Sequence, residues 1–148
     1  MAHLIFVFGT LKEGFRNFHV NRGQRVPGDF VTALPHPLYI AGDRGLPWLL
    51  QRPGQGLPVV GQLFGVDDEA LALMDQLERV DEPGYYERRR ISVLPRAASS
   101  AGTAPAPAPI EAWVYFGSEL GFTGALLHAG PIDEYLLVHQ KLLPRVLW

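Results

Sequence analysis

Six short runs rich in apolar, aromatic or β-branched residues, separated by segments that contain Gly or Pro, dominate this chain. They are residues 4–8, 29–34, 37–41, 57–66, 88–94 and 111–116. Runs of this length, bounded by turn-forming residues and recurring along the chain, are typical of the strands of a β-barrel or a β-sandwich. The sequence therefore predicts a mostly β domain and leaves the choice between barrel and sandwich open.

Two other segments carry helix signals. The first follows Asp67, a good N-cap residue, and runs to Glu78. The second is expected to start at Gly130-Pro131, with Pro at its first position and two acidic residues in its first turn. We expect Pro144 to end it.

Composition indicates one globular domain, 1–148. Hydrophobic residues make up 47% of the 148 residues and charged residues 19%, which is unlike a disordered chain. Residues 96–109 are low in complexity and rich in Ala and Pro, so we interpret them as a flexible loop within that domain. The apolar run 4–8 is too short to span a membrane or to form the core of a signal peptide, so we expect a cytoplasmic location and no membrane partner.

Charge and residue types exclude several classes of function. The net charge of -2 argues against a nucleic-acid partner, because phosphate binding needs a basic surface. The chain has no Cys, which excludes thiolate nucleophiles and Cys-based zinc sites. The five His residues have no metal-ligand spacing, so we expect neither a metal nor a cofactor. Ser118 lacks the G-x-S-x-G pattern of a serine hydrolase.

Glu78 is a candidate acid or base. On a helical wheel it falls within the apolar arc of the first helix, one turn beyond Met74 and two beyond Leu71. A carboxyl group on that arc is expected to be partly buried, which raises its pKa towards the range that suits proton transfer near neutral pH. The alternative is a frayed helix end at which Glu78 reaches solvent, and the wheel alone slightly favours this alternative.

The segment after the first strand candidate is the second place where chemistry is expected. A Gly directly after a buried strand, here Gly9, allows close backbone approach and leaves amide groups free to bind an anion. It is not a Walker A loop, since Phe15 stands where that motif has its Lys. A plain turn is the alternative. Tyr86, Tyr115 and Tyr135 are candidates for lining a pocket, although core packing explains them equally well.

Taken together, four motifs in order resemble the gamma-glutamyl cyclotransferase-like family. They are the opening Phe6-Val7-Phe8-Gly9-Thr10-Leu11-Lys12-Glu13-Gly14 with Asn17 and His19, the segment Ile40-Ala41-Gly42-Asp43-Arg44-Gly45-Leu46-Pro47-Trp48-Leu49-Leu50, the strand Val60-Gly61-Gln62-Leu63-Phe64-Gly65-Val66-Asp67, and Met74-Asp75-Gln76-Leu77-Glu78 followed by Tyr86-Glu87-Arg88. The second motif resembles the gamma-glutamylamine cyclotransferase branch in particular.

The resemblance implies an α+β fold, a small mixed β-barrel of about six strands with two flanking helices. It implies release of 5-oxoproline and a free amine from a gamma-glutamyl amine, by attack of the substrate's own α-amine on its γ-carbonyl. Carried over by position, Glu78 is the catalytic residue, and Phe8, Gly9, Thr10 and Leu11 form the substrate-binding loop. No cofactor is implied, and the partner is a small gamma-glutamyl substrate, gamma-glutamyl-lysine isopeptides among the candidates.

Three departures from the family pattern bear on specificity. Phe8 stands where the family usually has Tyr, Phe18 separates Asn17 from His19, and the segment from Glu78 to Tyr86 is about two residues longer. A non-catalytic member of the same fold that binds a small ligand or a protein is the main alternative function, and a cyclotransferase for another acyl chain is a third. The sequence does not indicate an oligomeric state.

Overall fold

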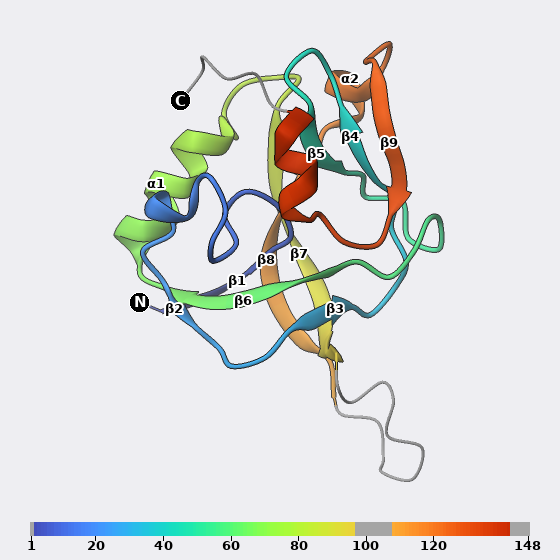
Figure 1. The fold of residues 1–148 in the computed structure, drawn as a ribbon. Helices are drawn as coiled ribbons and strands as arrows, with labels where there is room; N and C mark the ends of the chain where they lie inside the picture. The colour runs from blue at the N-terminus through green and yellow to red at the C-terminus, as the bar shows by residue number, and fades with distance from the viewer. Residues whose placement is uncertain (1, 97–107, 143–148) are drawn as a thin grey trace, which may run out of the picture.

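One six-stranded sheet forms most of the computed structural model, which describes residues 2–96 and 108–142 (Figure 1). Its strands are β1 (His3–Val7), β2 (Gln24–Arg25), β3 (Phe30–Thr32), β6 (Val60–Val66), β7 (Tyr86–Pro95) and β8 (Ile110–Gly117). They lie in the order β1-β8-β7-β3-β6-β2, and β1 also pairs with β6. That additional pairing closes five strands into a barrel, which decides between the barrel and the sandwich and confirms the predicted fold class.

A second sheet of three antiparallel strands lies against one end of the barrel (Figure 1). Its strands are β4 (Leu38–Ala41), β5 (Leu46–Leu49) and β9 (Leu127–Ile132), in the order β5-β4-β9. Trp48 of β5 donates a hydrogen bond of 3.1 Å from its indole nitrogen to the carbonyl oxygen of Ser118, just after β8. A Cβ atom on Gly117 would meet the Trp48 ring at 2.4 Å, so the missing side chain lets the two sheets approach.

Strand β1 is buried on both faces, which explains its unbroken apolar sequence. Successive side chains of a strand point to opposite faces, and Phe6 packs in the cluster inside the barrel while Ile5 and Val7 pack in a second cluster under the first helix. The strand pairs antiparallel with β6 and parallel with β8. The residues that follow β1 are therefore held between the two clusters.

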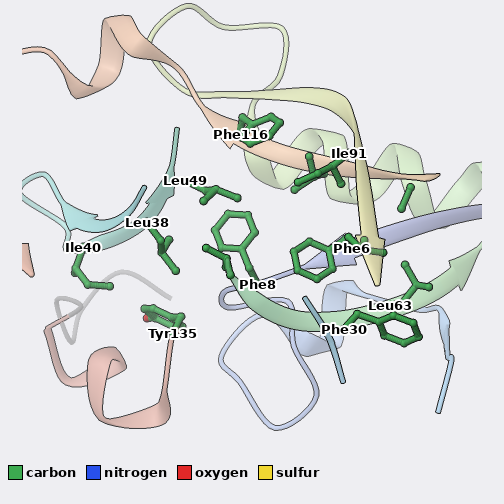
Figure 2. Packing of buried hydrophobic residues seen from close by; sticks show 14 residues of the cluster. Phe6, Phe8, Phe30, Leu38, Ile40, Leu49, Leu63, Ile91, Phe116 and Tyr135 are labelled. Atoms are coloured by element: carbon green, nitrogen blue, oxygen red, sulfur yellow. The ribbon is translucent and has the colours of Figure 1, made fainter. Parts of the chain in front are cut away.

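The main core extends from the inside of the barrel to the three-stranded sheet. Figure 2 shows Leu38 and Leu49 of the smaller sheet next to Phe8, with Phe6 beyond it and Phe30 at the far end of the same cluster. Side chains from both sheets thus belong to one cluster, so the smaller sheet is part of the same hydrophobic unit as the barrel.

Helix α1 (Asp68–Glu78) covers the outside of the barrel beside β1 and β6 (Figure 1). The carboxylate of Asp67 accepts a hydrogen bond of 2.8 Å from the amide of Ala70, so Asp67 is the N-cap that the sequence predicted. Leu71 and Met74 are buried on the face predicted to be apolar. Both ends of this helix agree with the prediction.

The helix predicted from Gly130-Pro131 is wrong at its start. Residues Leu127–Ile132 form strand β9 instead, and the Gly130-Pro131 peptide bond is cis. Gly130 has a φ of +122° and its backbone lies against the Leu38 carbonyl, where a Cβ atom would approach to 2.6 Å. Pairing with β4 therefore overrides the helix-start signal of the Pro.

The other helical segments are short. They are the 3-10 helix η1 (Phe18–Val20), α2 (Glu119–Phe122) and the 3-10 helix η3 (Leu137–Leu142). Residues 97–107 of the predicted loop at 96–109, and Pro144, lie outside the described residues. Of the helices that are described, none has the length and apolar character needed to cross a membrane.

Candidate active site

Glu78 lies at the C-terminal end of α1 and lines a cavity of about 70 Å³. Burial raises the pKa of its carboxyl to about 8, and no hydrogen bond or charge from a described residue contributes to the shift. The last carbonyls of a helix carry partial negative charge, which also disfavours a carboxylate at this position. Helix α1 is intact through Glu78, which is half-buried and lines a cavity, so the structure does not show the frayed, solvated helix end of the alternative.

The helix ends directly after Glu78. Arg79 adopts the left-handed conformation, with φ 54° and ψ 48°, and its amide donates to carbonyls of the preceding turn. The Arg79 side chain also lines the cavity and lies over the ring of Tyr85, with 5.0 Å from the guanidinium carbon to the ring centroid. This abrupt end turns the chain away while the Glu78 side chain stays at the cavity.

The cavity joins segments that are far apart in the sequence. Residues 6–11 of β1 and the turn after it form one side, and residues 77–79 at the end of α1 form another. The remaining lining residues are Asn17, Arg44, Leu46, Pro47, Tyr85, Tyr86 and Tyr115. All five residues that the sequence singled out, namely Phe8, Gly9, Thr10, Leu11 and Glu78, thus lie around one cavity.

The turn after β1 uses its carbonyl groups and leaves its amide groups available. The Gly9 carbonyl accepts from the Lys12 amide at 3.1 Å and the Thr10 carbonyl from the Asn17 amide at 2.9 Å. The Leu11 carbonyl accepts from the Asn21 side-chain amide at 3.1 Å. Among the described residues, none of the backbone hydrogen bonds is donated by the amides of Gly9, Thr10 or Leu11. Successive amides without an internal acceptor are the kind of backbone group that can bind an anion.

Gly9 is required for packing. A Cβ atom at this position would lie 2.7 Å from Cγ of Pro47, although the φ of Gly9 is not in the left-handed region. The sequence suggested that this Gly lets the backbone approach a ligand. The structure adds that the proline ring of β5 occupies the space of the missing side chain, so Gly9 fixes the distance between the turn and β5.

Contacts between side chains hold the cavity wall in place. Asp75, one turn before Glu78, accepts a hydrogen bond of 2.7 Å from the Tyr115 hydroxyl and forms an ion pair of 2.9 Å with Nε of Arg88. The Tyr86 hydroxyl donates to the carbonyl oxygen of Pro47 at 2.6 Å. These contacts join α1 to β8 and β7, and β7 to β5.

The three tyrosines singled out in the sequence have different roles: two line the cavity and one packs in the core. Tyr86 and Tyr115 line the cavity, and burial raises the pKa of both phenols. The charge of Glu78 contributes to both shifts, which indicates that both rings lie near its carboxyl. Tyr135 is fully buried in the main core instead.

Arg44, Pro47 and Tyr85 are among the lining residues that sequence reasoning did not assign to the site. Arg44 and Pro47 lie in a stretch that supported the family resemblance, but nothing local assigned them to a cavity. No sequence pattern assigned Tyr85 to the site, because it lies in the turn before β7 and is brought to the cavity only by the pairing of the barrel strands. Glu82, four residues after Glu78, is exposed, and its Oε2 lies 3.8 Å from Nε of Arg79. The described part of the chain contains no group of His, Asp and Glu side chains that could hold a metal ion.

Comparison with known proteins identifies the family. A family model described as gamma-glutamyl cyclotransferase, AIG2-like, matches residues 5–130. The chain belongs to the AIG2-like gamma-glutamyl cyclotransferase family. The matched residues include both the turn at Gly9 and Glu78, so the whole cavity described above lies within the AIG2-like domain.

Curated relatives and solved structures agree with this family. A gamma-glutamylaminecyclotransferase of Homo sapiens is 39% identical over an alignment of 119 residues, which covers 76% of this chain and 76% of the human protein. One from Bos taurus is 31% identical over 136 residues, 88% of this chain and 74% of the bovine protein. The crystal structure of an AIG2-like protein from Mus musculus has a TM-score of 0.68 at 28% identity and covers 90% of this chain and 88% of the mouse chain.

Proposed function

We propose that this protein is a gamma-glutamylamine cyclotransferase that releases 5-oxoproline and a free amine, with Glu78 as its proton-transfer residue. One observation carries the proposal: Glu78, whose carboxyl pKa is raised by burial, lines the same cavity as Gly9, Thr10 and Leu11, whose amides donate none of the backbone hydrogen bonds among the described residues. A base and a set of anion-binding donors are what an intramolecular acyl transfer needs. The names of the human and bovine relatives support the same activity.

The reaction needs no protein nucleophile. The substrate's α-ammonium group first loses a proton to Glu78, and the resulting amine attacks the γ-carbonyl carbon to close a five-membered ring. The bond between the γ-carbon and the leaving nitrogen then breaks. Glu78 gives the first proton to the leaving nitrogen as this bond breaks, so that a neutral amine is released. The ring nitrogen then gives its second proton through Glu78 to that amine, which departs as an ammonium ion and leaves Glu78 ionised as at the start. The products are 5-oxoproline and the amine, and no water is consumed.

The pKa of Glu78 suits this role. A general base works best when its pKa lies near the working pH and near the pKa of the group that it deprotonates. An ordinary glutamate, with a pKa of about 4.3, is a poor base for an ammonium group. A carboxyl group whose pKa is about 8 is much closer to the basicity of an amine, so proton transfer in both directions becomes accessible.

The amides of the turn supply the electrostatic stabilisation that the reaction needs. In our proposal the groups at Gly9, Thr10 and Leu11 hold an anionic oxygen of the substrate, either its α-carboxylate or the oxyanion that forms when the γ-carbonyl is attacked. The carbonyls of the turn are already bonded to Lys12, Asn17 and Asn21, which keeps them from turning towards the ligand. The donors are thus oriented before the substrate arrives.

A second cavity next to the first offers space for the leaving amine. It has a volume of about 320 Å³ and shares Arg44, Leu46 and Tyr85 with the first cavity. Gly42, Gly84 and Gly121 contribute backbone without side chains to its lining, and Trp48 contributes its ring. We assign the smaller cavity to the glutamyl group and the larger one to the amine.

The test of the reaction uses two substrates and labelled water. The protein should release 5-oxoproline from a gamma-glutamyl amine in ¹⁸O-water without taking up label, because ring closure adds no water. It should fail on the α-N-acetylated substrate, which keeps the scissile bond but lacks a competent nucleophile. Labelled glutamate as the first product, or turnover of the acetylated compound, would replace this proposal with an amidase. No turnover of any substrate would favour a binding protein of the same fold.

The assignment of the second cavity has its own test. Ala125→Leu adds bulk to a residue that lines only the larger cavity. It should raise KM for gamma-glutamyl amines with a long amine chain and leave gamma-glutamyl methylamine unaffected. An equal change for both substrates would show that the amine does not bind there.

A further inference from the structure

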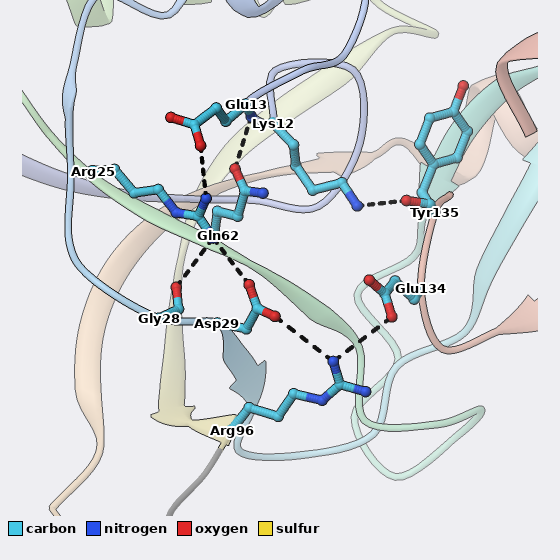
Figure 3. A network of polar contacts seen from close by, with 9 residues as sticks. All are labelled: Lys12, Glu13, Arg25, Gly28, Asp29, Gln62, Arg96, Glu134 and Tyr135. Atoms are coloured by element: carbon cyan, nitrogen blue, oxygen red, sulfur yellow. Dashed lines mark hydrogen bonds and ion pairs between the residues drawn. The ribbon is translucent and has the colours of Figure 1, made fainter. Parts of the chain in front are cut away.

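The turn at residues 9–12 is attached to a segment near the C-terminal end of the described chain. Lys12 Nζ donates a hydrogen bond of 2.5 Å to the carbonyl oxygen of Tyr135, and this contact is drawn in Figure 3. A few residues later, the amide of Arg16 donates to Oε1 of Gln140 at 2.7 Å. The loop that contains the anion-binding turn is therefore bonded twice to residues 133–140, which we call the C-terminal segment.

The Lys12 side chain is buried, which is rare for a lysine. Only 3% of the residue is exposed, and its ammonium group lies 4.3 Å from the centroid of the Phe15 ring. Burial lowers the pKa of Lys12 to about 8, while the charges of Glu134 and Asp29 raise it and that of Arg25 lowers it. A buried donor must keep its acceptor, so the bond to Tyr135 is the contact that makes this burial tolerable.

The C-terminal segment is itself fixed to the barrel. The carbonyl oxygen of Asp133 accepts from the amide of Val60 at 2.8 Å, and Tyr135 is fully buried in the main core. At the other end, the backbone amide of Lys12 closes the turn by donating to Gly9. A continuous series of contacts therefore leads from β6 through Tyr135 to the turn that lines the cavity.

The family match does not cover this support. The family model ends at residue 130, whereas Asp133, Tyr135 and Gln140 all follow it. The cavity lies within the matched residues, and its support on this side comes from outside them.

We propose that residues 133–140 act as a clamp that holds the Gly9–Lys12 turn in its anion-binding form, and that Lys12 is a positioning residue for the reaction. The inference rests on the proposed function for its activity readout. With this clamp, the geometry of the Gly9–Lys12 turn depends on a segment that is distant in the sequence. Lys12 acts through the turn and does not contact the substrate.

The experiment removes the two bonds of the clamp separately. Lys12→Met keeps the volume of the stem and removes the donor, and Gln140→Leu removes the acceptor for Arg16. Val93→Ala, in the barrel core and away from the turn, serves as a control for general destabilisation. All proteins are assayed for 5-oxoproline release at a temperature well below every melting temperature, so that each is folded.

We expect kcat/KM to fall about tenfold or more in Lys12→Met and by a smaller factor in Gln140→Leu, while Val93→Ala keeps the wild-type value. The acid limb of the pH profile should keep its midpoint near pH 8 in Lys12→Met, because Glu78 still carries the proton. A purely structural lysine would lower the melting temperature but leave kcat/KM of the folded protein unchanged, which would overturn the proposal. A shifted midpoint would overturn it too, by making Lys12 the titrating group.

Backbone NMR gives a second readout that needs no activity. The amide resonances of Gly9, Thr10 and Leu11 should shift or broaden in Lys12→Met and remain in place in Val93→Ala. If the wild-type protein releases no 5-oxoproline, the proposed function fails and the clamp is judged on these resonances alone. Unchanged amide resonances in Lys12→Met would reject the clamp whatever the activity.

Discussion

Asp75 and Tyr115 are joined by a hydrogen bond of 2.7 Å that links helix α1 to strand β8. The same carboxylate oxygen of Asp75 forms the ion pair with Arg88 of β7. One side chain thus fastens the last turn of the helix to two barrel strands. The family motif that combines Asp75, Glu78, Tyr86 and Arg88 gains a physical meaning here, because Asp75 and Arg88 hold the helix end from which Glu78 faces the cavity.

Asp75→Asn should weaken this attachment. The substitution keeps the shape but removes the charge that pairs with Arg88, in a partly buried place, so we expect a loss of about 1–3 kcal/mol in the free energy of unfolding. Turnover should fall as well, because the helix end is less well fixed. Urea unfolding at pH 7 measures the first effect and 5-oxoproline release the second. Asp81→Asn, at an exposed position, should change neither. Equal effects of the two variants would contradict this assignment.

Glu78→Gln tests the proton-transfer role directly. The amide keeps the size of the side chain and cannot exchange protons, so kcat should fall by roughly 10²–10⁴-fold, the usual contribution of a general base. The protein should remain folded, as judged by circular dichroism. Glu82→Gln is the matched control, since Glu82 is exposed and close in sequence. Activity of Glu78→Gln within a few-fold of wild type would remove Glu78 from the mechanism.

The pH profile of kcat/KM follows from the raised pKa of Glu78. Glu78 must be ionised to accept a proton, and the pKa of about 8 refers to the protein without substrate, which is the state that kcat/KM reports. We therefore expect kcat/KM to rise about tenfold per pH unit from pH 5 to 7 and to level off above pH 8. A profile that levels off near pH 5 would show an ordinary glutamate pKa in this cavity.

Stability should depend on pH through the same group. Between about pH 4.5 and 8, Glu78 is ionised in the unfolded chain and protonated in the folded one. The folded state then binds more protons, so stability falls as pH rises through this window, by a few kcal/mol in total. Glu78→Gln cannot ionise and should lose none of this. Urea unfolding at several pH values should show the variant gaining on wild type from pH 5 to 8, and a constant difference would contradict the shift.

Gly9→Ala should damage the site through Pro47. The added Cβ would lie 2.7 Å from Cγ of the proline, so either the turn or β5 must move. Because the turn carries the proposed anion-binding amides, we expect at least a tenfold drop in kcat/KM. Gly65→Ala is the control: its Cβ would come no closer than 3.9 Å to its nearest neighbour. Equal, wild-type activity of both variants would show that the turn tolerates a shift.

Capping residues and the spacing of apolar residues predicted the helix and the strands whose formation depends on neighbouring residues in the sequence. The capping residue Asp67 and the apolar spacing of α1 gave both ends of the helix and the face on which Glu78 lies. The six strand candidates all correspond to strands, because their patterns come from burial on one or both faces. The resemblance then connected the turn at Gly9 with Glu78, which no periodicity does.

The remaining parts of the fold depend on pairing between distant segments. Strand β5 contains Pro47 and is stabilised as the edge of a small sheet, so its sequence carried no strand signal. Strand β9 was mistaken for a helix start because Pro131 is equally suited to both, and only its partner β4 decides. Tyr85 precedes the barrel strand β7 and Arg44 lies between β4 and β5 of the smaller sheet, so both come to the cavity through tertiary packing that a linear pattern does not encode.

The left-handed backbone of Arg79 has a consequence for how this protein would respond to selection for stability. A residue with a Cβ atom in that conformation typically costs about 1 kcal/mol relative to glycine, which is the usual choice at a helix end. The chain carries an arginine there, with its side chain at the cavity and over Tyr85. A glycine at this position would raise the free energy of unfolding but would remove a cationic side chain from the cavity lining. At this helix end, a more stable protein and an intact cavity therefore exclude each other.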